Sequence, residues 1–378
     1  MQKKKIIYII NHLSFFYSHI MHHAVKARKA GYQIKVLCGD PISIDSEKFA
    51  KKKILQMKIS YINCKFSSVS FNPLKDILAF FKICMVLKDF RPDIVHATTS
   101  KAQIFGGLAA RIFRIKALVI FVSGMGYLFS NKLNFFENIY KKVFFIIQSI
   151  IFKHNKLMII VENNHDYKYF INSFSLKKND IKIIEGSGVN LKIFKRVNHI
   201  NNKIILLPAR VVKEKGIVEF IKAADLLKKY KYKFLIAGPL DYKKPSSFDQ
   251  SDLCKININQ SVKFIGYQKN IYSILKKTCI VCLPSYREGL PKSLCEAAAA
   301  GIPIVTTNTV GCTEVVKQGF NGELCRIKDH ISLKKKLEKL IKNSKIRKIY
   351  GDNSYTFARK NFDIELIGNK IINIYNNF

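Results

Sequence analysis

Short β-rich segments alternate with longer helical segments along most of this 378-residue chain. This alternation is typical of parallel sheets covered on both faces, because parallel strands are joined through crossover helices. In the first half, we predict helices at residues 19–30 and 73–90, and strands at 5–10, 33–39, 93–97, 117–122 and 156–162. A second series has helices near 215–230, 248–257, 269–277 and 291–300, and strands at 203–209, 233–238, 262–266, 279–284 and 302–307. The predicted fold class is therefore α/β.

The length of the chain and one polar segment indicate two domains. Single cores seldom grow beyond about 250 to 300 residues, and the strand–helix pattern restarts after the polar stretch KRVNHINNK at 195–203. We expect a Rossmann-like domain at residues 1–196, a second one at 203–360, and a C-terminal helix at 361–378 that packs back toward the first. Two such domains in series place the carboxyl ends of their strands around a cleft, where ligands of parallel sheets bind.

The apolar segments are interpreted as parts of the core. MQKKKIIYII begins like a signal peptide, but Asn11 and His12 interrupt the run and no small-residue cleavage site follows, so we predict a first strand. The most apolar segment, 143–152, has ten residues, about half of what a bilayer crossing needs. Cys279 and Cys282 are the only closely spaced pair among nine cysteines; we interpret them as core thiols in a reducing compartment rather than as zinc ligands.

The chain is strongly basic, with 65 Lys and Arg against 26 Asp and Glu. Residues 1–200 hold 33 basic and 11 acidic residues, and residues 201–378 hold 32 and 15, so the excess is spread evenly. A diffuse basic surface suits binding to anionic lipids, to a diphosphate substrate or to RNA. The alternative is that lysine simply replaces other polar residues on the surface of this protein. Because no concentrated patch and no nucleic-acid-binding module can be identified, we expect no nucleic-acid partner.

The stretch SYREGLPKSLCEAAAAGIPIV, at 285–305, places two carboxylates eight positions apart in this basic chain. Glu288 lies in the loop after a predicted strand, and Glu296 lies about five residues into the next helix, a rise of roughly 7 to 8 Å. Between them, the amides of Gly289 and Leu290 and of the first helical turn form a possible anion site. A carboxylate at each end with amide donors between them matches a ligand made of a sugar, a diphosphate and a ribose. The alternative is that Glu288 only caps the helix and Glu296 is an exposed acid on its surface.

A second constellation, PARVVKEKG at 208–216, follows another predicted strand. Arg210 and Lys215 flank the loop, and Gly216 opens the next helix. Two fixed cations in such a loop could hold a diphosphate, because charge-assisted hydrogen bonds are worth about 1.5 to 3 kcal/mol each. The alternative is that they are two surface cations among many.

These motifs together closely resemble the family-4 retaining glycosyltransferases of the GT-B fold. The resemblance rests on PARVVKEKG, FIGY at 264–267, LPSYREGLPKSLCEAAAAGIPIV at 283–305 and GCTEVVKQGFNG at 311–322. It implies two Rossmann-like domains whose parallel sheets face each other across a cleft. The first half resembles the subgroup that extends undecaprenyl-diphosphate-linked sugars in bacterial O-antigen, capsule or glycan assembly.

The resemblance also implies roles for individual residues. Arg210 and Lys215 would neutralise the donor diphosphate, and Glu288 would hold hydroxyls of the donor sugar as a positioning group. The amides of Gly289 and Leu290 would reach the sugar or the distal phosphate, and Glu296 would take the ribose hydroxyls. The backbone of Gly266 and Tyr267 would read the base, and Ser285 is a further expected donor-binding residue. Fixed cations and a helix N-terminus would do the work of a metal ion, so no metal or other cofactor is expected, although DYKKPSSFDQ at 241–250 is acidic enough to check.

The departures from the family pattern lie on the acceptor side. The loop after the first strand, NHLSFFYSH, lacks the Gly-Gly pair of many relatives, and Ser123, followed by Gly124, stands where many have a His-Gly. His96 ends a predicted strand beside the cleft, where it is either a structural histidine or an acceptor-side residue. Lys101, which opens the next helix, could meet the diphosphate of the acceptor.

The expected activity is transfer of a hexose or N-acetylhexosamine, with Gal or GalNAc through an α-1,3 bond as the first guess, from a UDP-sugar to a polyprenyl-diphosphate-linked saccharide. A GT-B-fold UDP-sugar epimerase and a transferase with a soluble acceptor are the alternatives. We expect a peripheral protein on the cytoplasmic face of the inner membrane, held on anionic lipids. Residues 18–31 and 135–156 mix aromatic or apolar residues with Lys, Arg and His, as an interfacial helix does, although core helices of a lysine-rich protein would look similar.

Overall fold

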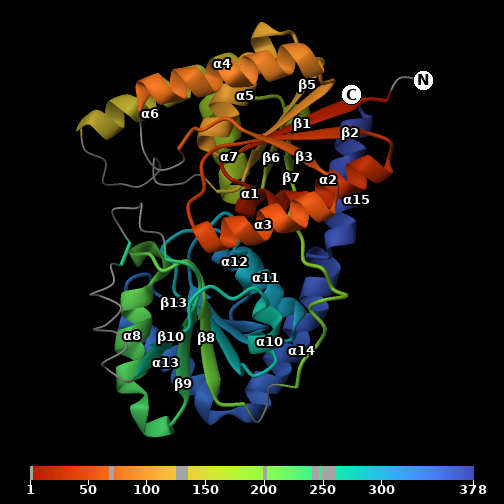
Figure 1. Ribbon diagram of the computed structural model, residues 1–378. Helices are drawn as coiled ribbons and strands as arrows, with labels where there is room; N and C mark the ends of the chain where they lie inside the picture. The colour runs from red at the N-terminus through yellow and green to blue at the C-terminus, as the bar shows by residue number, and fades with distance from the viewer. Residues whose placement is uncertain (1–2, 68–71, 125–134, 199–201, 241–246, 249–260) are drawn as a thin grey trace. The chain divides into compact units, whose positions relative to one another are not determined.

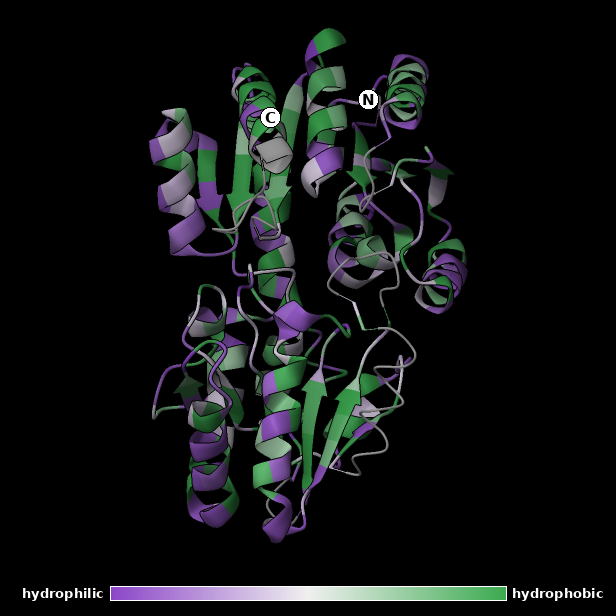
Figure 2. Ribbon diagram, turned by 90° about the vertical axis from the view of Figure 1, so that its left-hand side faces the viewer, coloured by the Kyte–Doolittle hydropathy of each residue, from purple (hydrophilic) through white to green (hydrophobic). Residues whose placement is uncertain are grey.

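The computed structural model describes residues 3–67, 72–124, 135–198, 202–240, 247–248 and 261–378. The chain divides into two compact units, residues 1–185 with 368–378 and residues 186–367. Each unit is built on its own parallel sheet (Figure 1). The strands of both sheets are mostly hydrophobic along their length, as expected for strands covered on both faces (Figure 2).

The first unit holds a seven-stranded sheet in the order β3-β2-β1-β4-β5-β6-β7, in which every pairing is parallel. Its strands are β1 (Lys5–Ile10), β2 (Gln33–Cys38), β3 (Ser60–Asn63), β4 (Ile94–Thr98), β5 (Ala117–Val122), β6 (Leu157–Val161) and β7 (Ile181–Ile183). Its helices are α1 (Leu13–Phe15) with a π-helical turn (Phe16–Ile20), α2 (Met21–Lys29), α3 (Ile44–Gln56), α4 (Pro73–Phe90), α5 (Ser100–Ile112), α6 (Phe135–Ile151) and α7 (Asn164–Phe174), with a 3₁₀ turn at Lys178–Asp180.

The second unit holds a six-stranded parallel sheet in the order β10-β9-β8-β11-β12-β13. Its strands are β8 (Ile204–Pro208), β9 (Lys233–Ala237), β10 (Val262–Phe264), β11 (Ile280–Leu283), β12 (Ile304–Thr307) and β13 (Gly322–Cys325). Its helices are α8 (Ile217–Leu226), α10 (Ile271–Leu275), α11 (Lys292–Ala299), α12 (Cys312–Val315), α13 (His330–Lys342) and α14 (Ser344–Asn361), with 3₁₀ turns at Lys213–Lys215 and Lys228–Tyr230. The last helix, α15 (Ile364–Asn376), starts in this unit and belongs to the first unit from Gly368 onward.

Local sequence signals fix several helix ends. The Asn72 side chain accepts a hydrogen bond from the Lys75 amide, and Pro73 occupies the first position of α4. The same helix ends at Arg91 in a left-handed conformation (φ 47°). Asn163 and Asp329 cap α7 and α13 in the same way. These caps explain why the predicted boundaries of α4 agree with the structure.

The α/β prediction with parallel sheets is confirmed, and each of the ten predicted strands is present. The sequence missed β3, β7 and β13, which are edge strands whose segments SYIN, IKI and GELC contain no continuous apolar run. The helix predicted at 248–257 lies almost wholly outside the described residues.

The division between the units differs from the predicted linker. It falls between Glu185 and Gly186, about ten residues before the polar stretch at 195–203. Val197 is buried in the second core and its amide donates to the Ala300 carbonyl oxygen, while Arg196 pairs with Asp352. The described residues 195–198 at the start of this polar stretch are therefore anchored in the second unit.

Candidate active site

The sheet of the second unit reverses its strand order between β8 and β11, which are paired neighbours. In open parallel sheets, ligands bind outside the carboxyl ends of the strands at this switch point. The two loops that leave β8 and β11 carry the two motifs singled out in the sequence, at 208–216 and 283–291. Both motifs therefore follow the strands that flank the switch point.

The loop after β8 is short and packs closely on the loop after β11. It forms a 3₁₀ turn at Lys213–Lys215 and ends at Gly216, whose backbone is left-handed (φ 71°). A Cβ atom at Gly216 would lie 2.1 Å from the Pro284 carbonyl oxygen. Glycine is needed here both for the backbone angle and for the close approach of the two loops.

Hydrogen bonds join the same two loops. The buried Ser285 hydroxyl and the Tyr286 amide both donate to the Glu214 carbonyl oxygen, at 3.1 and 2.9 Å. The Thr307 hydroxyl, at the end of β12, donates to the Ser285 carbonyl oxygen. Ser285, a predicted donor-binding residue, is thus held with its hydroxyl turned to the backbone of the neighbouring loop.

The structure brings Lys215 and Glu288 together. Lys215 Nζ lies 2.5 Å from Glu288 Oε1, and the two side chains are only 19% and 11% exposed. The Glu288 amide donates to the Val310 carbonyl oxygen at 3.2 Å, which fixes the loop position of this carboxylate. The sequence placed both residues in one site but gave no sign that they form an ion pair.

Helix α11 carries the second carboxylate, Glu296, one turn after Lys292 on the same side of the helix. Burial raises the pKa of Glu296 and lowers the pKa of Lys292, and the opposite charge of each partner works against these changes. The helix begins at Lys292, so Pro291, the predicted first residue, directly precedes it. Gly289 is buried and Leu290 is partly exposed, directly before it.

The loop after β10 contains Gly266 and Tyr267. Gly266 has a left-handed backbone (φ 68°) with open space at its Cβ position, so its backbone angle rather than crowding requires glycine. Its carbonyl oxygen accepts a hydrogen bond from the Gly238 amide at 3.0 Å, and a Cβ atom at Gly238 would lie 1.8 Å from the Ala209 carbonyl oxygen. The loops after β10, β9 and β8 are therefore linked along the carboxyl edge of this sheet.

Comparisons with known proteins agree with this geometry. The family model described as glycosyl transferases group 1 matches residues 190–357, and the model described as glycosyl transferase 4-like matches residues 5–154. The chain belongs to the glycosyltransferases.

Two curated relatives cover most of the chain. The N,N'-diacetylbacillosaminyl-diphospho-undecaprenol alpha-1,3-N-acetylgalactosaminyltransferase of Campylobacter jejuni is 29% identical over 338 residues, 86% of this chain and 87% of that protein. The UDP-Gal:alpha-D-GlcNAc-diphosphoundecaprenol alpha-1,3-galactosyltransferase of Escherichia coli is 25% identical over 323 residues, 80% of each. Among solved structures, Anabaena HepE in complex with UDP-glucose matches with a TM-score of 0.77 at 18% identity, over 99% of this chain and 100% of that one. The predicted GT-B fold is thus confirmed.

The site of this glycosyltransferase includes residues to which the sequence analysis gave no role. A Cβ atom at Gly311 would lie 2.6 Å from the Glu288 carbonyl oxygen and 2.5 Å from that of Gly289, so the loop after β12 packs on the loop that carries Glu288. The Tyr286 hydroxyl donates to both carboxylate oxygens of Glu219, at 3.0 and 3.1 Å. The motif GCTEVV at 311–316, shortly after a predicted strand, was the sequence signal for the contact of Gly311 with the Glu288 loop. Nothing in the sequence indicates the hydrogen bond between Tyr286 and Glu219.

Lys101, Ser123 and Gly124, which the sequence predicted on the acceptor side, lie in the first unit, at the carboxyl ends of its strands. Lys101 is in the first turn of α5, and its Nζ lies 2.8 and 2.9 Å from the two carboxylate oxygens of Asp76 on α4. Ser123 and Gly124 directly follow β5, and Gly124 has a left-handed backbone (φ 86°). Lys101 therefore stabilises the packing of α5 on α4, whatever else it does.

His96 lies in the middle of β4 rather than at its end, and it is fully buried. Its Nδ1 is 2.6 Å from the hydroxyl of Tyr375 on α15, and its ring packs against Tyr8. Burial lowers the pKa of His96 to about 3, so the ring is neutral. These contacts correct the predicted position beside a cleft and favour the structural interpretation that the sequence had left open.

The loop after β1, which has no Gly-Gly pair, is held by a carboxylate from α3. The amides of Leu13 and Ser14 donate to the two carboxylate oxygens of Glu47, at 2.9 and 3.0 Å. A side chain from α3 thus occupies the amide donors at the start of this helical segment.

The predicted core thiols are confirmed as buried. Cys279 and Cys282 lie in and next to β11, and burial raises the pKa of the Cys282 thiol. Within the described residues, no three His, Cys, Asp or Glu side chains are grouped so that they could hold a metal ion. Most of the acidic stretch at 241–250 lies outside the described part of the chain.

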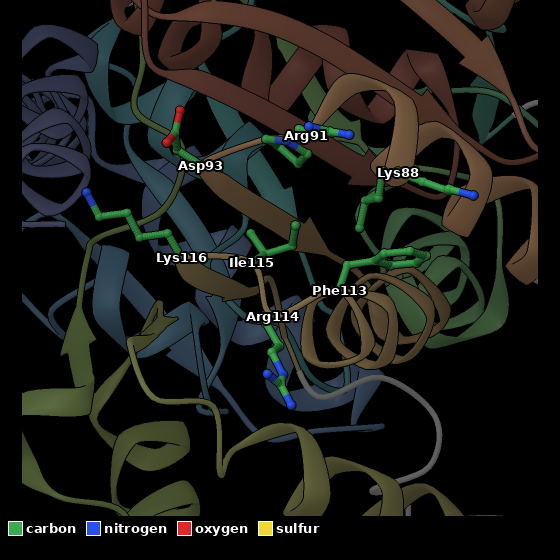
Figure 3. Close-up of a pocket in the computed structure, with 9 residues that line it drawn as sticks. Lys88, Arg91, Asp93, Phe113, Arg114, Ile115 and Lys116 are labelled. Atoms are coloured by element: carbon green, nitrogen blue, oxygen red, sulfur yellow. The ribbon is translucent and has the colours of Figure 1, made fainter.

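A basic cavity of about 330 Å³ lies in the first unit, lined by residues of the segments 87–93 and 113–116. These segments precede β4 and β5, so the cavity is at the amino edge of the sheet, away from the edge where ligands of parallel sheets bind. Figure 3 shows the charged ends of Lys88, Arg114 and Lys116 pointing away from Ile115 in different directions. This arrangement is not a converging set of catalytic groups.

Proposed function

We propose that this glycosyltransferase transfers galactose or N-acetylgalactosamine from a UDP-sugar to a saccharide carried on undecaprenyl diphosphate. The proposal includes formation of an α-1,3 bond with retention of the anomeric configuration. It is supported by the two relatives, whose names specify α-1,3 transfer of these sugars to diphospho-undecaprenol-linked acceptors. The observation that carries it is the Lys215–Glu288 pair on the two switch-point loops of the second unit.

In this proposal, the second unit binds the donor. Arg210 and Lys215 neutralise the diphosphate, which gains charge as the glycosidic bond breaks. Before the donor arrives, Glu288 holds the Lys215 side chain in the site. Glu288 orients hydroxyls of the donor sugar, and the backbone of Gly289 and Leu290 contacts the sugar or the distal phosphate. Ser285 stabilises this loop through its hydrogen bond to the Glu214 carbonyl oxygen.

In the same proposal, the nucleoside is bound by α11 and by the loop after β10. Glu296 on α11 accepts hydrogen bonds from the ribose hydroxyls, and the backbone around Gly266 and Tyr267 contacts the uracil. Burial raises the pKa of Glu296, and ribose hydroxyls that donate to the charged carboxylate would lower this pKa again.

The reaction proceeds by attack from the face that the diphosphate leaves. The acceptor hydroxyl oxygen forms a bond to the anomeric carbon, the bond from that carbon to the diphosphate oxygen breaks, and the departing oxygen takes the hydroxyl proton. Glu288 therefore acts as a positioning group and forms no covalent bond. The fixed cations take the role of a metal ion, so activity is expected to persist in EDTA.

The test is a transfer assay with the purified chain, four UDP-sugars (Gal, GalNAc, Glc and GlcNAc) and a synthetic polyprenyl-diphosphate-linked monosaccharide. The expected product carries one added Gal or GalNAc, and nuclear magnetic resonance of that product reports the α-linkage. Glu288→Gln should lower kcat by about 10²-fold or more, while Glu365→Gln, at an exposed acid on α15, should not. Epimerised UDP-sugar without acceptor, or transfer only to a lipid-free oligosaccharide, would replace the proposal with one of the two alternatives.

A further inference from the structure

Large hydrophobic side chains are exposed in a concentrated group on three helices of the first unit. Of the nineteen such side chains among the described residues, ten lie on α4, α5 and α6. They are Leu74, Ile77, Leu78, Phe81 and Met85 on α4, Ile112 on α5, and Ile139, Val143, Ile146 and Ile150 on α6. We call this surface the α4–α6 face. Single exposed hydrophobic residues are ordinary, but a group of this size concentrated on three packed helices indicates an interaction surface.

The exposed residues form a stripe on each of the two long helices. On α4 they recur at helical spacing and are 52% to 76% exposed, while Ala79, Ile83 and Leu87 on the opposite side are buried in the core. On α6 the four residues are 45% to 61% exposed, while Phe144 and Ile151 are buried. Both helices therefore have two apolar sides, of which the sheet covers only one.

The three helices form one layer. Lys101 of α5 pairs with Asp76 of α4 at 2.8 Å, and Gln148 of α6 donates to Gln103 of α5 at 3.5 Å. A Cβ atom at Gly107 of α5 would lie 2.5 Å from the Ile151 side chain of α6, so these helices pack closely. Figure 1 shows α4, α5 and α6 together on the same side of the sheet. The two stripes therefore belong to one layer of the first unit.

The surroundings of this face are strongly basic. Residues 73–116 and 135–156 hold twelve Lys and Arg against four acidic residues, and one of these four, Asp76, is already paired with Lys101. Four of the cations, Lys88, Arg91, Arg114 and Lys116, surround the basic cavity where α4 and α5 end (Figure 3). An apolar surface edged by cations matches an anionic bilayer, because hydrocarbon side chains enter the acyl boundary while lysines reach the phosphates.

We propose that the α4–α6 face is the surface by which this enzyme docks on an anionic lipid membrane. A second copy of the chain is a poorer occupant, because a two-fold dimer through this face would place two strongly positive surfaces against each other. No helix in the described ranges is long and apolar enough to cross a bilayer, so the contact is interfacial. The biological purpose rests on the proposed function, in which the acceptor is lipid-linked.

The assignment differs from the expectation for residues 18–31. On α2, His23, Ala24 and Ala27 are buried, and no residue of this helix is among the exposed large hydrophobic ones. That segment packs within the first unit, whereas the segment 135–156 contributes four residues to the α4–α6 face. The helix α4, which composition alone did not single out for lipid binding, contributes the larger share.

Vesicle flotation with the full chain tests the proposal. Vesicles of phosphatidylcholine with about 30% phosphatidylglycerol should carry the wild-type protein upward, and vesicles of phosphatidylcholine alone should carry much less. Phe81→Asp with Met85→Asp, and separately Ile146→Asp with Ile150→Asp, should each lower the partition coefficient about tenfold or more. Arg114→Ala with Lys116→Ala should lower it severalfold, and less so at high salt.

The matched control is Leu226→Asp with Ile349→Asp, two residues of the second unit that are 47% and 55% exposed. This variant should float like the wild type, and circular dichroism should show all variants folded. Equal flotation of the two α4–α6 face variants and the wild type would overturn the proposal. The proposal would also be overturned if sedimentation showed that the wild type is a dimer and that Phe81→Asp with Met85→Asp dissociates it without changing lipid binding. Flotation uses no sugar substrate, so its outcome is independent of whether the transfer assay succeeds.

Discussion

Glu323 on β13 offers a quantitative test of how this basic protein uses a buried acid. Its side chain is fully buried and accepts hydrogen bonds from Lys336 (2.9 Å), Gln318 (2.7 Å), the Tyr350 hydroxyl (2.8 Å) and Lys339. These partners come from the loop before β13 and from α13 and α14, so one carboxylate joins β13 to two helices. Glu323→Gln keeps the volume and removes the charge.

The magnitude follows from the pKa of Glu323. Burial by itself would raise this pKa, but hydrogen bonds from Lys339, Lys336, Gln318 and Tyr350 outweigh burial and lower it from 4.5 to about 2. Each pKa unit corresponds to about 1.4 kcal/mol, so the charged carboxylate contributes about 3 kcal/mol to the free energy of unfolding. Because the folded-state pKa is lowered, this contribution is complete above pH 4.5 and is lost as the pH falls from 4.5 to 2.

Urea unfolding followed by circular dichroism at pH 7, 4.5 and 3 measures this effect. At pH 7, Glu323→Gln should be less stable than the wild type by about 2 to 3 kcal/mol, and at pH 3 the difference should be less than half as large. Glu365→Gln, at an exposed carboxylate, is the control and should follow the wild type at each pH. A destabilisation of equal size at pH 7 and pH 3 would show that shape, not charge, accounts for the role of Glu323, and would refute the reasoning.

Three further predictions concern the site and the core. Arg210→Ala should weaken UDP binding about tenfold or more in calorimetry, because a charge-assisted contact with the diphosphate would be lost. Glu288→Gln should leave UDP binding intact and lower the rate of sugar transfer. A loss of UDP binding in Glu288→Gln would contradict the assignment of Glu288 to the sugar. Gly216→Ala should lower stability by about 2 kcal/mol or more in urea unfolding, because its Cβ would lie 2.1 Å from a carbonyl oxygen at a positive φ; wild-type stability would contradict the close packing of the two loops. His96→Phe should reduce the loss of stability on lowering the pH from 6.5 toward 3, because the wild-type imidazole, with its pKa lowered to about 3, binds a proton readily only after unfolding; an unchanged pH dependence would show that His96 is solvated.

The sequence predicted the parts of the fold that repeat over many residues. The strands at 5–10 and 117–122 and the helix at 73–90 agree with β1, β5 and α4, because long buried runs and an Asn-Pro helix start are strong local signals. The short strands β3, β7 and β13 depend on neighbours in the sheet rather than on their own three or four residues. Tertiary pairing, which no local pattern records, decides those elements.

The candidate site shows the same division between local and tertiary information. The spacing of residues in the two motifs predicted the loops after β8 and β11 and the position of Gly216, because a strand-to-helix turn needs a glycine at a fixed position. The pairing of Lys215 with Glu288 joins residues 73 positions apart and could not be seen from spacing. His96 was misplaced because only the contact with Tyr375, 279 positions later, shows that its ring is enclosed.

Acids are scarce in this protein, and the structure shows what several of them do. Asp76 holds Lys101 between α4 and α5, and Glu323 holds Lys336 between β13 and α13; both pairs join elements of one core. Lys215 and Glu288 instead join two loops at the carboxyl edge of the sheet, where an arriving diphosphate would compete for the lysine. In the proposed function, that competition frees the Glu288 carboxylate for the sugar hydroxyls at the moment the donor binds. In this proposal, both charges find new partners when the pair opens, the diphosphate for Lys215 and the sugar hydroxyls for Glu288, whereas the two core pairs have no ligand to replace them.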